Sequence, residues 1–155
     1  FNGVIGIATG GSTTTVAAPQ MDAVTRSSLR ERALAVLESA AISEDPLLRA
    51  NALEALQIAP TRAETRARVA LADENLGVRY VAAMTVGELG LQRLAPLVEP
   101  LLNDSAPQVR AAAIYALTSL GRKVDPSPLA GMLRSTDPSV RSTAAFVLGE
   151  LGNPR

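Results

Sequence analysis

The sequence predicts an all-α solenoid of about four stacked helix pairs, preceded by a non-helical leader. Four arginines recur at intervals of 30, 31 and 31 residues, each after an aliphatic residue and near the start of an alanine-rich stretch. Internal periods of roughly 20 to 50 residues are typical of stacked repeat proteins. The 155-residue chain is 47% hydrophobic but only 3% aromatic, which suits closely packed helices better than a β-sandwich. The four arginines are Arg49, Arg79, Arg110 and Arg141.

We expect the leader, residues 1–24, to be extended or disordered. Residues 1–21 are uncharged and rich in Gly, Thr, Ser and Ala, a composition that does not sustain a helix. Its apolar run, residues 4–8, falls far short of the roughly 20 residues that span a bilayer. A plain linker is one interpretation, and the protein is then expected in the cytoplasm. The alternative is the remnant of an export signal over residues 1–18, which would place it in the cell envelope.

Residues 25–155 form the predicted repeat domain, with units at about residues 27–60, 61–90, 91–121 and 122–152. In the first unit, residues 27–41 place apolar side chains three and four positions apart, which predicts an amphipathic helix. The second helix should begin at Asp45 and Pro46, because Asp accepts from free N–H groups and Pro is tolerated at the first helical position. Asn75 and Asp137 are the corresponding caps of later units.

The first helices of the later units are predicted over residues 62–73, 91–103 and 127–134. Pro96 and Pro100 should bend or shorten the second of these, because each lacks an N–H donor. Each second helix is expected to end at a residue that stops helices, either a proline or a glycine in the left-handed conformation. These residues are Pro60, Gly90, Gly121 and Gly152.

The pattern Asp-Pro-x-Val-Arg, followed by Ala and then Leu-Gly-x-Leu-Gly, resembles the HEAT repeat. It occurs as DPSVRSTAAFVLGELG in the last unit, and is most similar to the short bacterial form named for phycobilisome lyases. The resemblance covers residues 27–155, although the first unit departs from it at Gln57 and Pro60. It implies a right-handed superhelix whose second helices line the concave side. It also implies a scaffold for protein interactions in most members and an enzymatic role in a few.

Projection of the second helices separates a buried stripe from a concave face. The stripe includes the alanine three residues after each arginine: Ala52, Ala82, Ala113 and Ala144. On the opposite side, solvent-facing aromatic and methionine side chains would form an apolar strip for a partner, and the alternative is that they pack against adjacent helices. The candidate partner-binding residues are Glu54, Tyr80, Met84, Glu88, Tyr115, Ser119, Phe146 and Glu150.

The four arginines predict a ladder of ion pairs between units, because acidic residues recur at matching positions. The alternative is a track for anions or phosphates, which the equal numbers of basic and acidic residues, 15 each, do not favour. The expected acidic partners are Asp45, Glu74, Asp104 and Asp137.

The sequence predicts a non-catalytic protein that binds a protein partner, with no cofactor and no metal. The chain has no His and no Cys, which excludes Ser-His-Asp and Cys-His catalysis and structural zinc sites. One alternative is an enzyme-associated subunit, similar to a bilin lyase or binding a small ligand through Tyr80, Tyr115 or Arg79. Nucleic-acid binding is another, disfavoured by the glutamates of the concave face.

The two ends of the chain suggest a piece of a larger repeat protein. The chain starts with Phe, as a processed or excised piece would, and residues 151–155 resemble the opening of another repeat. A last helix pair without a polar outer side would leave apolar surface uncovered. We therefore expect either further repeats or self-association through the last unit.

Overall fold

The structure is a computed structural model that describes residues 22–152, and every element within this range is helical. The chain divides into two compact units, residues 1–33 and 34–155. The expectations for residues 1–21 and 153–155 lie outside the described residues. The α-helices are α1 (Ala23–Ala40), α2 (Pro46–Ala55), α3 (Pro60–Ala70), α4 (Leu76–Glu88), α5 (Ala95–Val98), α6 (Pro107–Ser119), α7 (Ser127–Met132) and α8 (Pro138–Gly152), and the 3₁₀-helices are η1 (Leu56–Ile58), η2 (Gln92–Leu94) and η3 (Glu99–Asn103).

Helix α1 begins at Ala23, four residues before the predicted start. Its first turn is capped by Asp22, whose carboxylate accepts from the Thr25 N–H at 2.7 Å and from the Thr25 hydroxyl at 2.8 Å. These residues belong to the first unit. The last seven residues of α1 belong to the second unit, where Leu34 is buried against Leu56 and Ala63.

The second helices begin where the sequence predicts. Asp45 accepts from the Leu47 N–H at 2.8 Å, Asn75 from the Gly77 N–H at 2.8 Å, and Asp137 from the Ser139 N–H at 2.8 Å. Each of these bonds satisfies a donor that the first turn of a helix leaves free. The predicted caps of α2, α4 and α8 are thereby confirmed.

The predicted stops are correct at two of the four positions. Gly90 and Gly121 have φ values of 62° and 75°, the left-handed conformation that favours glycine. Gly152 still lies within α8 without a positive φ, so the prediction of a left-handed stop there is wrong. Pro60 does not end α2, which already stops at Ala55; instead Pro60 opens α3, because proline fits the first turn of a helix.

The first helix of the third unit is broken, as its prolines predict. Residues 92–103 form η2, a single turn of α-helix in α5, and then η3. Pro96 lies in the first turn of α5 and Pro100 in the first turn of η3. Because a proline can supply no N–H to the helical ladder, the segment changes helix type instead of continuing.

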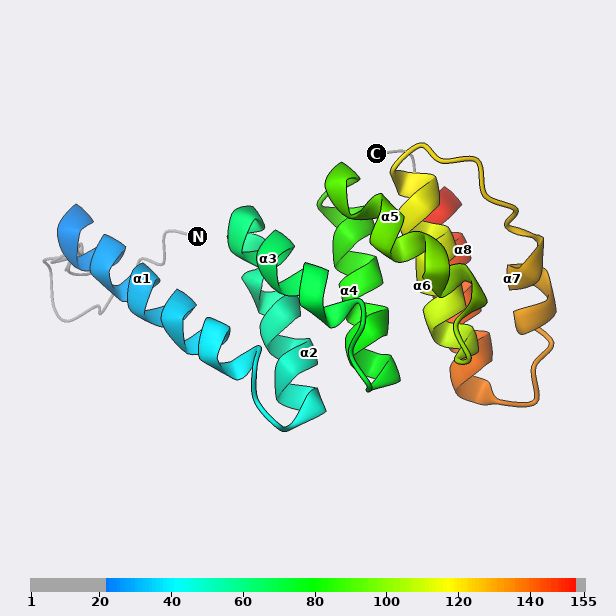
Figure 1. Cartoon of the computed structure of the whole chain (residues 1–155), viewed down its shortest axis with the longest axis horizontal. Coiled ribbons are helices and arrows are strands. Elements are labelled where there is room, and N and C mark those ends of the chain that lie inside the picture. The colour runs from blue at the N-terminus through cyan, green and yellow to red at the C-terminus, as the bar shows by residue number, and fades with distance from the viewer. Residues whose placement is uncertain (1–21, 153–155) are drawn as a thin grey trace, which may run out of the picture. The chain divides into compact units, whose positions relative to one another are not determined.

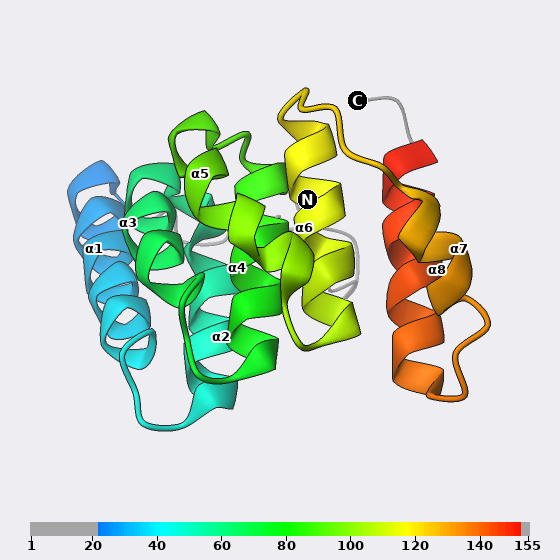
Figure 2. The ribbon, with the colours of Figure 1, turned by 45° about the vertical axis from the view of Figure 1, so that its right-hand side comes forward.

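The second helices of the chain form a continuous row within residues 34–155. Helix α2 packs against α4, α4 against α6, and α6 against α8, while α3, α5 and α7 pack against α4, α6 and α8 respectively. Figures 1 and 2 show α4, α6 and α8 following one another, with α5 beside α6 and α7 beside α8. The buried stripe lies along this row, and each of its four predicted alanines is at most 3% exposed: Ala52, Ala82, Ala113 and Ala144.

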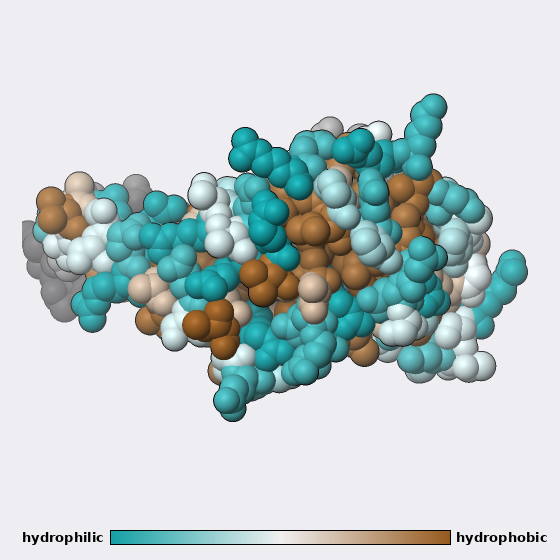
Figure 3. All heavy atoms as spheres, in the orientation of Figure 1, coloured by the Kyte–Doolittle hydropathy of each residue, from teal (hydrophilic) through white to brown (hydrophobic). Residues whose placement is uncertain are grey.

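The core is continuous through the middle of the row. A single cluster of buried side chains extends from Leu53 in α2 to Val147 in α8. In Figure 3 hydrophobic side chains gather where Figure 1 places α4, α5 and α6. None of the helices within residues 22–152 combines the length and the hydropathy needed to cross a membrane.

Candidate functional site

The predicted concave-face residues differ in their exposure. Phe146 is 48% exposed, and Glu54 and Ser119 are exposed as well. Tyr80, Glu88 and Glu150 are half-buried. These six side chains are therefore available, at least in part, on the surface of the row.

Met84 and Tyr115 are not on the surface, so the expectation of a solvent-facing strip is wrong for both. Tyr115 is 1% exposed and Met84 is 6% exposed. The burial of Tyr115 depends on Gly87 in α4: a Cβ at Gly87 would lie 2.7 Å from Cε1 of Tyr115 and 2.9 Å from Cα of Ala116. Real Cβ atoms do not approach other atoms so closely. Only a glycine at position 87 therefore leaves room for the tyrosine ring. Tyr115 thus joins α4 to α6 and belongs to the core.

The remaining face residues surround two hollows that meet at Glu88. The smaller one, called here the Tyr80 hollow, has a volume of about 160 Å³ and is formed by α2, α4, α8 and η1. The larger one, the Glu150 hollow, has a volume of about 430 Å³ and lies along the ends of α4, α6 and α8. The Tyr80 hollow is lined by Glu54, Gln57, Tyr80, Val81, Met84, Glu88 and Phe146, and the Glu150 hollow by Gly87, Glu88, Leu89, Gly90, Thr118, Ser119, Glu150 and Leu151.

The two hollows are acidic. Glu54, Glu88 and Glu150 contribute carboxylates, and the lining residues include no lysine or arginine. Partial burial raises the pKa of the Tyr80 phenol, and the negative charges of Glu88 and Glu54 raise it further. Tyr80 therefore stays neutral at physiological pH, close to the carboxylates of Glu88 and Glu54.

Gln57 and Val81 also line the Tyr80 hollow, and sequence analysis did not select them. The Gln57 side-chain amide donates to Oε2 of Glu88 at 2.7 Å and to the hydroxyl of Thr85 at 3.1 Å. Thr85 is fully buried, so this bond satisfies a polar group inside the core. Gln57 stands where the second and fourth units have a glycine, a difference that the sequence already shows. Its side chain bridges η1 and α4.

The arginines form a ladder between repeats, but with partners that differ in part from the predicted ones. The guanidinium of Arg79 donates to both carboxylate oxygens of Asp104, at 2.8 and 2.9 Å, as predicted. Arg49 makes the same paired contact with Asp73, at 2.8 Å to each oxygen, and not with Glu74. Such two-point contacts fix the orientation of both partners.

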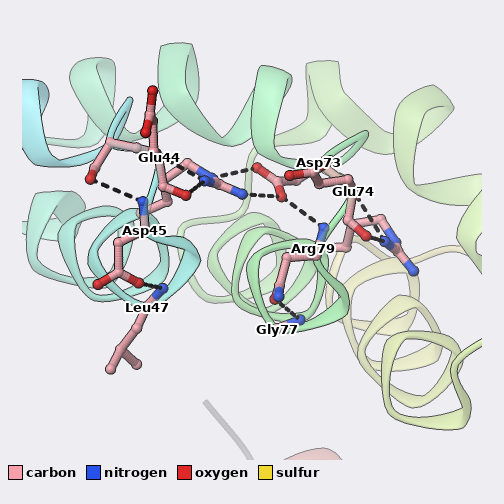
Figure 4. A network of polar contacts seen from close by, with 10 residues as sticks. Glu44, Asp45, Leu47, Asp73, Glu74, Gly77 and Arg79 are labelled. Carbon is pink, nitrogen blue, oxygen red and sulfur yellow. Dashed lines mark hydrogen bonds and ion pairs between the residues drawn. The ribbon is translucent and has the colours of Figure 1, made fainter.

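All four arginines share a second interaction that the sequence did not reveal. The Nη1 group of each donates to the two carbonyl oxygens that lie six and five residues earlier, in the loop before its own helix. For Arg79 these are the carbonyls of Asp73 and Glu74, at 2.8 and 2.9 Å. The network runs from the turn at Glu44 and Asp45 through Asp73 to Arg79 (Figure 4). The other carbonyls are those of Ser43, Glu44, Asp104, Ser105, Ser135 and Thr136.

The ladder of ion pairs stops at Arg110. Among the described residues, no acidic side chain pairs with Arg110 or Arg141. Position 135, which corresponds to Asp73 and Asp104, holds a serine. The ion pairs expected for Asp45, Glu74 and Asp137 are therefore wrong: Asp45 and Asp137 cap their own helices, and Glu74 contributes its backbone carbonyl.

The two ladder carboxylates have lowered pKa values. At Asp104 the hydrogen bond from Arg79 lowers the pKa, against the opposing effect of burial. At Asp73 burial would raise the pKa, but the hydrogen bonds from Arg49 and from the Asn75 N–H outweigh it. Both carboxylates are thus ionised in the folded protein and hold neighbouring repeats together. Neither lines the two hollows.

The described residues contain no group of three acidic side chains arranged to hold a metal ion. A comparison with protein families matches residues 63–149, more than half of the chain, to HEAT repeats. A search of curated proteins gave no match. The matched region contains α4, α6 and nearly all of α8, and so most of the helices that form the two hollows.

Proposed function

Because this chain belongs to the family of HEAT repeat proteins, we propose that it is a non-catalytic scaffold that binds a protein partner across the two hollows of its second-helix row. One observation carries the proposal: α2, α4 and α8 bring predicted face residues from separate repeats to a single hollow. Exposed Phe146 provides an apolar contact there, surrounded by polar side chains. Apolar contacts within a polar rim are typical of protein interfaces.

We further propose three features that the repeated motif implies. The second helices form the concave side of a right-handed superhelix, and the chain is of the short bacterial type named for phycobilisome lyases. We also propose that residues 25–155 act as one repeat domain after the leader, residues 1–24, of which residues 23 and 24 are helical and not extended as predicted. The support for these features is the repeated motif itself, which is most complete in α8.

Two alternatives have weaker support. Of the three polar groups considered for a small ligand, Tyr115 is buried and Arg79 is engaged by Asp104, which leaves Tyr80. A volume of about 160 Å³ is also below the 300 Å³ or more of typical small-molecule sites. Nucleic acid would meet the carboxylates of Glu54, Glu88 and Glu150 instead of the basic groups that neutralise phosphates.

A second interaction is proposed at the end of the row. The outer side of α8 exposes 37% of Leu148, whereas the equivalent Val86 and Leu117 in α4 and α6 are at most 1% exposed. Helices α4 and α6 each pack against the second helix that follows them. We further propose that this side of α8 is covered by association with a second copy of the chain.

The main proposal is tested by selecting peptides from a random display library on the immobilised protein. Peptides that bind are then mapped by ¹H–¹⁵N NMR on the labelled chain. We expect the largest shifts around Tyr80, Glu88, Ser119 and Phe146, because these residues surround the hollows.

The matched variants place a bulky side chain on or off the face. Ser119→Trp should fill the Glu150 hollow and weaken peptide binding at least about tenfold, as expected for an obstructed interface centre. Ser105→Trp, at an exposed loop position away from the hollows, should leave binding unchanged. Selected peptides that map to the first-helix side, and are insensitive to Ser119→Trp, would overturn the proposal.

A further inference from the structure

The Tyr80 hollow combines aromatic side chains with carboxylates. Its walls include the aromatic side chains of Tyr80 and Phe146 from two different helices. Its rim includes the carboxylates of Glu54 and Glu88. Aromatic faces and carboxylates both attract cations, the first through the ring quadrupole and the second through charge.

One contact of the Glu88 carboxylate is with a neutral amide. The Gln57 amide donates to Oε2 of Glu88 at 2.7 Å, and a neutral amide orients a carboxylate without cancelling its charge. Both glutamates raise the pKa of the Tyr80 phenol, as expected for carboxylates that line the same hollow. The ring and the two carboxylates therefore act on the same small volume.

The size of the hollow limits what it can hold. About 160 Å³ accommodates one long side chain but not a folded element or a ligand of drug size. An apolar side chain placed there would remove water from two carboxylates without compensation, which is costly. A cationic side chain would compensate the carboxylates and contact the rings.

Among cationic side chains, arginine fits these features best. Its planar guanidinium stacks on aromatic rings and donates to carboxylates at two points, whereas the lysine ammonium is a compact, strongly hydrated charge. Glu88 also lines the Glu150 hollow, where Glu150 contributes a third carboxylate. A bound segment therefore meets negative charge on both sides of its anchoring residue.

We propose that the Tyr80 hollow accepts an arginine side chain from a basic segment of the protein partner. This rests on the proposed function, because it specifies how the same face recognises its partner. Glu54 and Glu88 supply the countercharge, Tyr80 and Phe146 supply the stacking surface, and Gln57 positions Glu88.

The test uses the whole chain and three small probes, Nα-acetyl-arginine amide, the neutral isostere Nα-acetyl-citrulline amide, and Nα-acetyl-lysine amide. In ¹H–¹⁵N NMR titrations we expect the arginine probe to shift Tyr80, Glu88 and Phe146 saturably, with a dissociation constant in the range of about 1–10 mM. The citrulline probe should produce no saturable shift, and the lysine probe should bind more weakly than the arginine probe. Raising the salt concentration should weaken arginine binding, because the attraction is screened.

Charge-neutral variants separate this site from a general attraction to acidic protein. Glu88→Gln and Glu54→Gln should each weaken the arginine probe about threefold or more, in the range of a partly exposed ion pair. Glu99→Gln, which removes one charge from an exposed position outside both hollows, is the matched control and should have no effect. Circular dichroism of each variant checks that the fold is retained.

Several results would overturn the inference. These are equal binding of the citrulline and arginine probes, tighter binding of the lysine probe, shifts centred away from the Tyr80 hollow, or equal losses in Glu88→Gln and Glu99→Gln. If display-selected peptides still map to the hollows while the arginine probe fails, the scaffold proposal stands and the arginine proposal alone is wrong. If the peptides map elsewhere while the arginine probe binds here, the scaffold proposal fails.

Discussion

At the scale of single residues, the repeated arginine bonds to the loop before its own helix in all four units, and in the first two units it also pairs with an aspartate of the next repeat. Asp73 illustrates both links, because its carboxylate accepts from Arg49 and its backbone carbonyl accepts from Arg79. Asp104 occupies the same position between Arg79 and Arg110. The loop contact needs no particular side chain and occurs in all four units, whereas the ion pair needs an aspartate six residues before the next arginine.

Ser135→Asp should extend this ladder by one ion pair, between α6 and α8. Position 135 lies six residues before Arg141, and the Ser135 hydroxyl already accepts from the Asp137 N–H, as the carboxylate of Asp104 does from Ala106. The new carboxylate would face Arg110 as Asp104 faces Arg79. We expect the free energy of unfolding at pH 7, measured by urea denaturation, to rise by about 0.5–1 kcal/mol.

The matched control is Ser43→Asp, whose hydroxyl makes the same turn contact with Asp45 but which has no preceding ladder arginine in the described chain. This variant should give little or no gain. In Ser135→Asp the carboxylate should have a lowered folded pKa, as at Asp104, so its contribution exists above the unfolded pKa of about 3.9 and is lost as pH falls through the folded pKa. Equal effects of the two variants, or a gain that persists in strong acid, would contradict the ladder.

Residues with the same position in the repeat do not always have the same surroundings. Tyr115 and Phe146 are equivalent by sequence, yet one is buried and the other is 48% exposed. A helical projection gives the direction of a side chain from its own helix, but the space available is set by the neighbouring helix. For Tyr115 that space comes from Gly87. The sequence could therefore predict the face but not which of its residues reach solvent.

At the scale of helices, two equivalent glycines show how a neighbour changes the effect of a residue. Gly87 in α4 and Gly149 in α8 both lie eight residues after their arginines. A Cβ at Gly87 would contact Tyr115 and Ala116 at less than 3.0 Å, whereas a Cβ at Gly149 would have no atom within 4 Å. The same glycine is required in α4 and unnecessary for packing in α8.

Alanine substitution should therefore have opposite effects at the two positions. Gly87→Ala should lower the free energy of unfolding by about 1–3 kcal/mol, because α4 and α6 must move apart. Gly149→Ala should raise it by about 0.5–1 kcal/mol, because alanine favours the helix and meets no obstacle. Thermal and urea denaturation at a low protein concentration measure both, and a loss of similar size at the two positions would show that α8 is covered in solution.

Most helix starts could be predicted from the sequence because they depend on local chemistry. The caps Asp45, Asn75 and Asp137 act within two residues, and the prolines of residues 92–103 act within one turn. Pro60 was misassigned because a proline that ends one helix and a proline that begins the next have the same local sequence. The partner of Arg49 could not be identified from its own unit, because Asp73 and Glu74 are adjacent and only the packing of α2 on α4 selects between them.

At the scale of the molecule, the row of second helices has an uneven distribution of contacts. Helix α6 is packed between α4 and α8, and its residues 111–117 are all buried. Helix α8 has a second-helix neighbour on one side in the described chain, and Leu148 is exposed. The residues equivalent to Leu148 in α4 and α6 are buried. An apolar side chain that is exposed only in the last repeat is a reason to expect association there.

We expect the protein to self-associate through this side of α8. The weight-average sedimentation coefficient should rise with protein concentration, because burying Leu148 and its neighbours removes apolar surface from water. Leu148→Glu should abolish the rise, since the carboxylate would be desolvated at the contact. Leu97→Glu on α5 is the matched control, because Leu97 is 40% exposed and Leu148 is 37% exposed. A concentration-independent monomer, or equal effects of the two substitutions, would contradict self-association through this side of α8.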